Sequence, residues 1–166
     1  MALPTDNKVV NYSTITRLAQ LARRRGKKII FKSGCFDIIH IGHVYALSRA
    51  KLLGDILIVG LGSDATVKKL KGKNRPIVPE VLRARTLAAL GCVDYVVILR
   101  EPLQGRIDHA QLLRLVRPTY YSPTPGDSAM AEKRKLAKVV GAKIRLIPSY
   151  SPLSSTKLAA ALIRTG

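Results

Sequence analysis

Short apolar runs alternate along this chain with stretches in which apolar residues recur every three or four positions. The runs are rich in β-branched residues and predict strands near 28–33, 55–61, 94–99, 117–121 and 143–147. The recurring pattern predicts helices near 13–25, 43–53, 64–70, 80–90, 106–115, 129–140 and 154–164. Strands that alternate with helices in this way are typical of an α/β fold, in which helices cover both faces of a parallel sheet.

The chain has 166 residues, which is enough for one domain with a full hydrophobic core. We assign residues 1–12 to an N-terminal tail and residues 13–166 to a single domain. No apolar run approaches eighteen residues, which excludes a membrane-spanning helix, and the chain does not open with a leader pattern. We therefore expect a cytoplasmic protein without a membrane partner.

The formal net charge is +19, from 29 Lys and Arg residues against 10 Asp and Glu residues, so the chain attracts anions. One basic cluster suits the binding of a triphosphate. It contains Lys68, Lys69, Lys71, Lys73, Arg75, Arg83 and Arg85. Other basic runs, at 23–28 and 133–135, lie away from any motif and are typical of a solvated face. With two Phe and no Trp, the chain has few aromatic residues for stacking on bases, so nucleic-acid binding ranks low.

The stretch from Gly34 to His43 places two histidines beside a glycine where a strand gives way to a helix. Unpaired backbone N–H groups and the helix dipole favour an anion at such a junction. Gly42 allows a ligand to approach the backbone, and His40 and His43 can lie on the same side of the first helical turn. Each imidazole can donate a hydrogen bond to a phosphate oxygen, and a protonated ring would add charge. The stretch therefore predicts a phosphate site.

Two plainer interpretations of the histidine pair stay open at this point. The pair could hold a metal ion, but Cys35 and Cys92 are the two cysteines of the chain and form no Cys-x-x-Cys motif, so we expect no metal site. The pair could also start a helix without any further role. Two cysteines that lie far apart in sequence say little about disulfides, so a reducing compartment is the default expectation.

The residues Gly34-Cys35-Phe36-Asp37-x-x-His40-x-Gly42-His43 resemble the signature of the cytidylyltransferase-like nucleotidyltransferases. Further segments follow in the order and spacing of one branch, the D-glycero-β-D-manno-heptose 1-phosphate adenylyltransferases, which often form the C-terminal half of a bifunctional ADP-heptose synthesis enzyme. These segments are 53–60, 63–64, 70–77, 83–84, 87–90 and 93–97. The resemblance is dense over residues 13–100 and implies a Rossmann-like three-layer sandwich with a five-stranded parallel sheet, the HxGH nucleotidyltransferase fold.

The resemblance also implies roles for individual residues. His40, His43 and Lys71 would be catalytic, because they would contact the nucleoside triphosphate and neutralise the charge that develops at its α-phosphate. The nucleotide-binding residues would be Gly34, Cys35, Phe36, Gly42, Arg75, Ser154, Ser155 and Thr156, the last three at the start of the final helix. A further set, Asp37, Arg83 and Asp127, would bind the acceptor. Asp64 is interpreted as the N-cap of its helix rather than as a ribose contact.

One segment departs from the family pattern. After the fourth strand the family usually has a Lys-Gly-Gly-Asp-Tyr-like sequence, whereas this chain has Tyr121-Ser122-Pro123-Thr124-Pro125-Gly126-Asp127-Ser128. The Gly-Asp pair is retained, but the lysine and the aromatic residue are absent. The sequence therefore leaves open the identity of the acceptor and the choice between adenine and cytosine.

The sequence as a whole predicts a nucleotidyltransferase that transfers the AMP moiety of ATP to heptose 1-phosphate, giving ADP-heptose and pyrophosphate. Mg²⁺ would be bound through the triphosphate. The alternatives are a CTP-dependent glycerol-3-phosphate cytidylyltransferase, an FAD synthetase-like enzyme, and a non-catalytic basic protein that binds nucleotides or RNA. Family members commonly pair, so a homodimer is one expected assembly.

Overall fold

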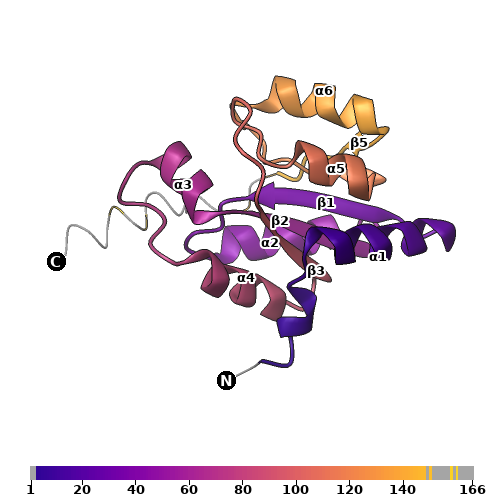
Figure 1. Ribbon diagram of the computed structural model, residues 1–166, viewed down its shortest axis with the longest axis horizontal. Helices are drawn as coiled ribbons and strands as arrows, with labels where there is room; N and C mark the ends of the chain where they lie inside the picture. Colours follow the sequence, from indigo (N-terminus) through magenta and orange to yellow (C-terminus); the bar gives the residue numbers. More distant parts are fainter. Residues whose placement is uncertain (1–2, 149, 151–157, 159, 161–166) are drawn as a thin grey trace.

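Five parallel strands form one sheet in the order β3-β2-β1-β4-β5 (Figure 1). The strands are β1 (Ile29–Gly34), β2 (Ile56–Gly62), β3 (Tyr95–Leu99), β4 (Tyr120–Tyr121) and β5 (Lys143–Ile144). This computed structural model describes residues 3–148, 150, 158 and 160. In chain order β2 and β3 extend the sheet to one side of β1, and β4 and β5 extend it to the other. The strand order therefore reverses at β1, which is where parallel α/β sheets bind ligands.

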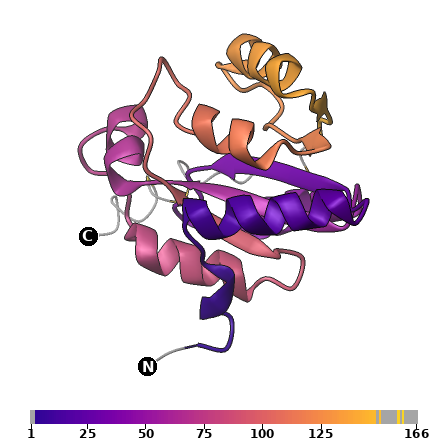
Figure 2. The ribbon, with the colours of Figure 1, turned by 45° about the vertical axis from the view of Figure 1, so that its right-hand side comes forward.

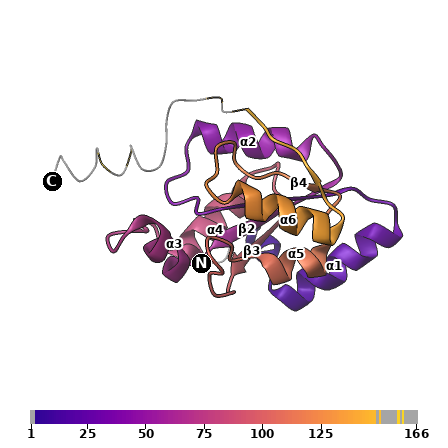
Figure 3. The same ribbon diagram turned by 90° about the horizontal axis from the view of Figure 1, so that it is seen from above.

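Helices cover both faces of the sheet, as Figure 3 shows for α2 on one side and α1 and α5 on the other. Their bounds are α1 (Tyr12–Arg24), α2 (Ile41–Lys51), α3 (Asp64–Lys71), α4 (Glu80–Ala89), α5 (Ala110–Val116) and α6 (Met130–Val140). Buried side chains of α1, α5 and α6 share one core with the sheet, and those of α2 and α4 share the other. Figure 2 shows α1, in indigo, running along the strands. The predicted α/β fold with a five-stranded parallel sheet is thus confirmed.

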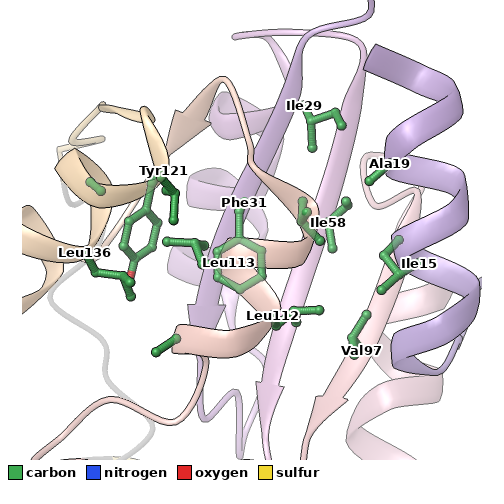
Figure 4. Close-up of a cluster of buried hydrophobic side chains, with 14 of the residues drawn as sticks. Ile15, Ala19, Ile29, Phe31, Ile58, Val97, Leu112, Leu113, Tyr121 and Leu136 are labelled. Atoms are coloured by element: carbon green, nitrogen blue, oxygen red, sulfur yellow. The ribbon is translucent and has the colours of Figure 1, made fainter. Parts of the chain in front are cut away.

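The core beneath α1 and α5 is built on β1 and β2 (Figure 4). Phe31 and Ile58 of the two central strands are buried there, and Ile15 of α1 packs against the same cluster with no exposed surface. The alternation of side chains along β1 sends Ile30 to the opposite core, where it packs with Leu47 of α2. Apolar residues thus occupy both faces of β1, which explains its nearly continuous apolar sequence.

Two helix starts show how short polar side chains fix the elements. Asn11 accepts a hydrogen bond from the backbone N–H of Thr14 at 2.9 Å and caps α1. Ser63 accepts one from Thr66 at 3.1 Å and caps α3. The interpretation of Asp64 as an N-cap is therefore wrong by one residue, because the Ser63 hydroxyl already satisfies that helix start.

The predicted elements differ from the observed ones mainly in the second half of the chain. The helix predicted over 106–115 begins at Ala110, because Gln104 and Ile107 pair in an antiparallel turn through Gly105, which has φ of 62°. The strands predicted over 117–121 and 143–147 are each reduced to two residues. The helix predicted over 154–164 lies outside the described residues, apart from residues 158 and 160.

The segment before α1 has more contacts than its description as a tail implies. Asp6–Lys8 form a short 3-10 helix, and the backbone N–H of Val10 donates to the Val96 carbonyl of β3 at 2.9 Å. Arg85 of α4 donates to both carboxylate oxygens of Asp6, at 2.9 and 2.7 Å. These hydrogen bonds lower the pKa of Asp6 to about 2, with the Arg85 contact as the largest cause. The N-terminal segment is thus attached to the edge of the sheet.

Within the described part of the chain, no helix is both long and apolar enough to cross a bilayer.

Candidate active site

A cavity of about 570 Å³ opens at the carboxyl ends of the strands, next to β1. Its walls come from the end of β1, the start of α2, the end of α3 and the segments after β4 and β5. Among its lining residues are Gly34, Cys35, Phe36, Asp37, His40, Gly42, His43, Lys71, Arg75 and Asp127, all predicted for the site. Its ionisable side chains other than histidine and cysteine comprise five basic and three acidic groups, so the cavity favours an anion.

The two histidines of the motif meet at the first turn of α2. His40 is the N-cap, and its Nδ1 accepts a hydrogen bond from the backbone N–H of Gly42 at 3.2 Å. In the neutral ring this contact places the proton on Nε2, which becomes a donor. The ring of His43 lies with its centroid 4.0 Å from that of His40. The motif thus presents two imidazoles side by side, as the sequence predicted.

Both histidines are held in the neutral form. Burial lowers the pKa of His40. Burial also lowers the pKa of His43, to about 4, and the neighbouring His40 and Lys32 act in the same direction. At neutral pH the rings are therefore hydrogen-bond donors rather than cations. The expectation that a protonated ring adds charge is corrected for the free cavity, because burial disfavours the protonated form of both rings and His40 adds to this effect at His43.

Phe36 packs against the ring of His43, and Gly34 leaves room for the Phe36 ring. The Phe36 ring packs edge-on against His43, with centroids 5.2 Å apart, and is almost fully buried. A Cβ atom at position 34 would come within 2.9 Å of the Phe36 ring, so a side chain there would force that ring to move. Phe36 itself has φ of 46°, a left-handed conformation that costs energy for a residue with a side chain. The Phe36 ring thus packs against His43 and also lines the cavity.

Asp37 organises the loop that follows Lys71. Its carboxylate accepts hydrogen bonds from the backbone N–H groups of Ile77 and Val78, at 2.8 and 2.9 Å, and from Nε of Arg75. Burial alone would raise the pKa of Asp37, but these hydrogen bonds outweigh it and keep the pKa below its ordinary value. Asp37 and Arg75 thus form a buried ion pair in the cavity wall. These contacts support a role for Asp37 in organising the loop, in place of the expected contact with the acceptor.

Lys71, at the end of α3, lines the cavity on the side of Cys35. Burial raises the pKa of the Cys35 thiol, and the charge of Lys71 only partly opposes this effect. Cys35 is therefore a protonated thiol at neutral pH, which makes it a wall residue rather than a nucleophile.

Arg83 does not line the cavity. Its side chain is fully buried, and its guanidinium donates to the carbonyl oxygens of Cys35, Gly62 and Val78 and to the carboxylate of Asp64. We therefore replace the expected acceptor contact by a supporting role, in which Arg83 ties together the loops after β1 and β2. Its position within a helix did not reveal this role, because the three carbonyl groups come from separate segments.

The side of the cavity near β4 contains two lysines whose roles the sequence did not predict. Lys32 of β1 donates from Nζ to the Ser122 carbonyl at 3.1 Å. Lys133 of α6 belongs to the basic run 133–135 that was expected on a solvated face, but it is buried in the cavity wall and pairs with Asp127 at 2.7 Å. Burial opposes ionisation of Asp127, but the contacts with Lys133 and with the backbone of Ala129 keep its pKa below the ordinary value. The one sequence signal for Lys32 was a charged residue inside an otherwise apolar strand.

On the same side of the cavity, the side chains of Asp108, His109 and Tyr121 form a buried series of hydrogen bonds. Nδ1 of His109 is 2.9 Å from a carboxylate oxygen of Asp108, and its Nε2 is 2.6 Å from the hydroxyl of Tyr121. In the tautomer that carries its proton on Nδ1, His109 donates to Asp108 and accepts from Tyr121. Burial is the main reason that the pKa of Tyr121 is raised, so its hydroxyl keeps its proton. Asp108 and His109 both line the cavity and are candidates for contacts with ligand hydroxyl groups.

The predicted Ser154, Ser155 and Thr156 lie outside the described residues.

A parallel sheet with paired histidines and a basic cavity at its switch point is the arrangement of a nucleotidyltransferase. The family model described as cytidylyltransferase-like matches residues 31–161, and the chain belongs to that family. The chain is 38% identical over 159 residues to the bifunctional protein HldE of Syntrophotalea carbinolica, covering 95% of this chain and 31% of the relative. It is 37% identical over 161 residues to the bifunctional protein HldE of Geobacter metallireducens, covering 96% and 32%. The chain thus spans about a third of the length of these relatives, and the family resemblance seen in the sequence is confirmed.

Two solved structures have the same fold. The lipopolysaccharide core biosynthesis protein from Thermoplasma volcanium GSS1 superposes with a TM-score of 0.63 and 27% identity, covering 76% of this chain and all of the other. Pantoate–β-alanine ligase from Francisella tularensis, in complex with β,γ-ATP and β-alanine, gives a TM-score of 0.65 at 18% identity, covering 92% of this chain and 76% of the other. The second similarity concerns the fold alone.

Proposed function

We propose that this chain transfers the AMP moiety of ATP to D-glycero-β-D-manno-heptose 1-phosphate, giving ADP-heptose and pyrophosphate. The observation that carries the proposal is the pair His40 and His43, which lie side by side at the start of α2 in a basic cavity. Similarity to the bifunctional HldE proteins over 95% or more of this chain supports the choice of acceptor. A cytoplasmic location and a homodimer stay predictions.

In the proposed reaction an oxygen of the acceptor phosphate attacks the α-phosphorus of ATP. A new P–O bond forms as the bond between the α-phosphorus and its bridging oxygen breaks, and that oxygen leaves with the pyrophosphate. The acceptor phosphate is already an anion, so no general base is needed. Catalysis then comes from alignment and from stabilisation of charge on the transferring phosphoryl group.

Two kinds of cavity residue would stabilise this charge, namely hydrogen-bond donors and cationic side chains. His40 and His43 would donate hydrogen bonds to oxygens of the α-phosphate, and Lys71 would neutralise the β- and γ-phosphates with help from Arg75. Gly34, Cys35 and Gly42 would form the surface against which the nucleotide rests. Ser154, Ser155 and Thr156 are proposed to contact the β- and γ-phosphates. Asp127 is proposed to contact the acceptor.

We place Mg²⁺ on the triphosphate. Among the described residues, no group of three or more His, Cys, Asp or Glu side chains could hold an ion. Of the three carboxylates that line the cavity, Asp37 pairs with Arg75, Asp127 pairs with Lys133, and Asp108 contacts His109. When bound, the ion would neutralise charge on the leaving pyrophosphate.

The test is pyrophosphate release by the purified chain with ATP or CTP, each combined with heptose 1-phosphate, glycerol 3-phosphate or flavin mononucleotide. We expect release with ATP and the heptose, and ADP-heptose as the product by mass spectrometry. Release only with CTP and glycerol 3-phosphate, or only with ATP and flavin mononucleotide, would replace the proposed reaction by the corresponding alternative. Absence of release from every pair, together with salt-sensitive retention of RNA, would leave a non-catalytic binding protein.

A further inference from the structure

Lys32 is a buried lysine at the wall of the cavity. It lies in β1 between the buried residues Phe31 and Ser33, and only 4% of its surface is exposed. Among the described residues, its Nζ donates one hydrogen bond, to the Ser122 carbonyl after β4. An ammonium group has three N–H donors, so two remain for other partners.

No carboxylate among the described residues lies within 4.0 Å of Lys32 Nζ, unlike the situation of Arg75 and Lys133 in the same cavity. A buried cation without a counter-ion is destabilising. Burial accordingly lowers the pKa of Lys32 to about 8, and Lys133 acts in the same direction while Asp127 opposes it. Lys32 therefore has a fixed position, an orienting hydrogen bond and spare donors, but no ion-pair contact within 4.0 Å among the described residues.

The positive charge of Lys32 acts on the histidine pair across the cavity, because it is one of the causes that lower the pKa of His43. With both histidines neutral, the ring donors supply no full positive charge there. Lys71 lines the cavity near Cys35, and Lys32 lines it near Ser122. A polyanion in the cavity would thus meet a lysine at each of two walls.

We propose that Lys32 binds a phosphate group of the substrate and thereby provides the negative partner that its buried ammonium lacks. This inference rests on the proposed function in that the substrates are taken to be a nucleoside triphosphate and a sugar phosphate. Phosphate is the common chemistry, and the two sources are separated by experiment. The Ser122 carbonyl orients the ammonium group, so the contact is built before the ligand arrives.

The test variant is Lys32→Met, which removes the charge and keeps the length of the side chain. The variant removes an unpaired buried charge, which is stabilising, but it also leaves the Ser122 carbonyl without its donor, so we expect a thermal midpoint close to that of the unmodified chain. The matched control is Lys135→Met, which removes the same charge from an exposed position on α6. Lys32→Gln is the second variant should Lys32→Met fail to fold.

Binding is measured by calorimetry with three separate probes: inorganic pyrophosphate, the ATP analogue α,β-methylene-ATP with Mg²⁺, and heptose 1-phosphate. We expect Lys32→Met to weaken at least one of them by roughly tenfold to a hundredfold, the loss typical of a charge-assisted contact, and Lys135→Met to change none by more than about twofold. A loss with the ATP analogue and pyrophosphate alone assigns Lys32 to the triphosphate. A loss with the heptose alone assigns it to the acceptor.

Affinities of Lys32→Met within about twofold of the unmodified chain for all three probes would overturn the inference, as would equal losses in Lys32→Met and Lys135→Met. Failure of the proposed function gives a different pattern. The unmodified chain would then form no ADP-heptose, while its binding of pyrophosphate or of the ATP analogue would still depend on Lys32. Binding of none of the three probes by the unmodified chain would overturn both.

Discussion

The imidazole rings of His40 and His43 lie with their centroids 4.0 Å apart and tilted by 36°. At this distance a proton on one ring raises the free energy of a proton on the other. The free cavity therefore contains two neutral donors, and its positive charge comes from lysine and arginine. A phosphate bound between the rings would reverse part of this effect, because its negative charge favours the protonated form.

We predict that His43→Ala lowers turnover by about a hundredfold or more, the effect of removing one donor that stabilises the transition state. The measurement is pyrophosphate release with saturating ATP and acceptor. The fold should persist, which circular dichroism of the variant can show. Release close to that of the unmodified chain would contradict the role given to His43.

The same residue predicts how stability depends on pH. The pKa of His43 is about 4 in the folded chain against 6.5 as its ordinary value, so between these values the unfolded chain binds a proton that the folded chain does not. Stability is therefore full above pH 6.5 and decreases as the pH falls towards 4, by about 2 kcal/mol between pH 7 and pH 5. Urea unfolding at these two pH values measures the decrease. In His43→Ala the decrease should be smaller by about that amount, and an unchanged decrease would show that another group causes it.

Arg83 provides a prediction about stability rather than binding. Arg83→Met leaves the carbonyl groups of Cys35 and Gly62 without their buried guanidinium donor, so we expect the free energy of unfolding to fall by roughly 3–5 kcal/mol. Arg100→Met is the control, because Arg100 pairs with Glu80 but its side chain is 61% exposed. An exposed pair contributes less than about 1 kcal/mol. Equal losses in the two variants by urea unfolding would contradict the supporting role of Arg83.

The periodic sequence was sufficient to predict the sheet and the helix layers, because apolar spacing reports which face of an element is buried. It was also sufficient to place Gly34 to His43 at the end of β1, where the chain must leave the sheet. The elements that it misplaced are short or begin in turns, as at Ala110, where local hydrogen bonds decide the boundary.

The sequence could not reveal contacts between segments that lie far apart along the chain. The departure from the family pattern at 121–128 was visible as the loss of a lysine. What was not visible is that β1 and β4 are neighbours, so that Lys32 reaches the Ser122 carbonyl from the adjacent strand. The pairing of His109 with Tyr121 depends on the same strand order and was missed for the same reason.

Asp37 gives a final prediction, because its carboxylate links the end of β1 to the loop that carries Arg75. An asparagine side chain has one acceptor oxygen and no charge, so Asp37→Asn cannot accept from Arg75, Ile77 and Val78 together. The loop between α3 and α4 would then lose its anchor, and both Arg75 and the neighbouring Lys71 would be less well placed. We expect the KM for the nucleoside triphosphate to rise by about tenfold, since charge-assisted hydrogen bonds contribute on the order of 1.5–3 kcal/mol.

Asp94→Asn is the matched control for this prediction. The Asp94 carboxylate also accepts a backbone N–H, from Leu57 at 2.7 Å, and pairs with a basic side chain, Lys51 at 2.6 Å, but it does not line the cavity. Its replacement should lower the thermal midpoint and leave the KM unchanged. Steady-state kinetics of both variants over a range of ATP concentrations separates the two effects. A KM that rises equally in both would mean that general loosening of the fold, and not the anchoring of the loop by Asp37, controls nucleotide binding.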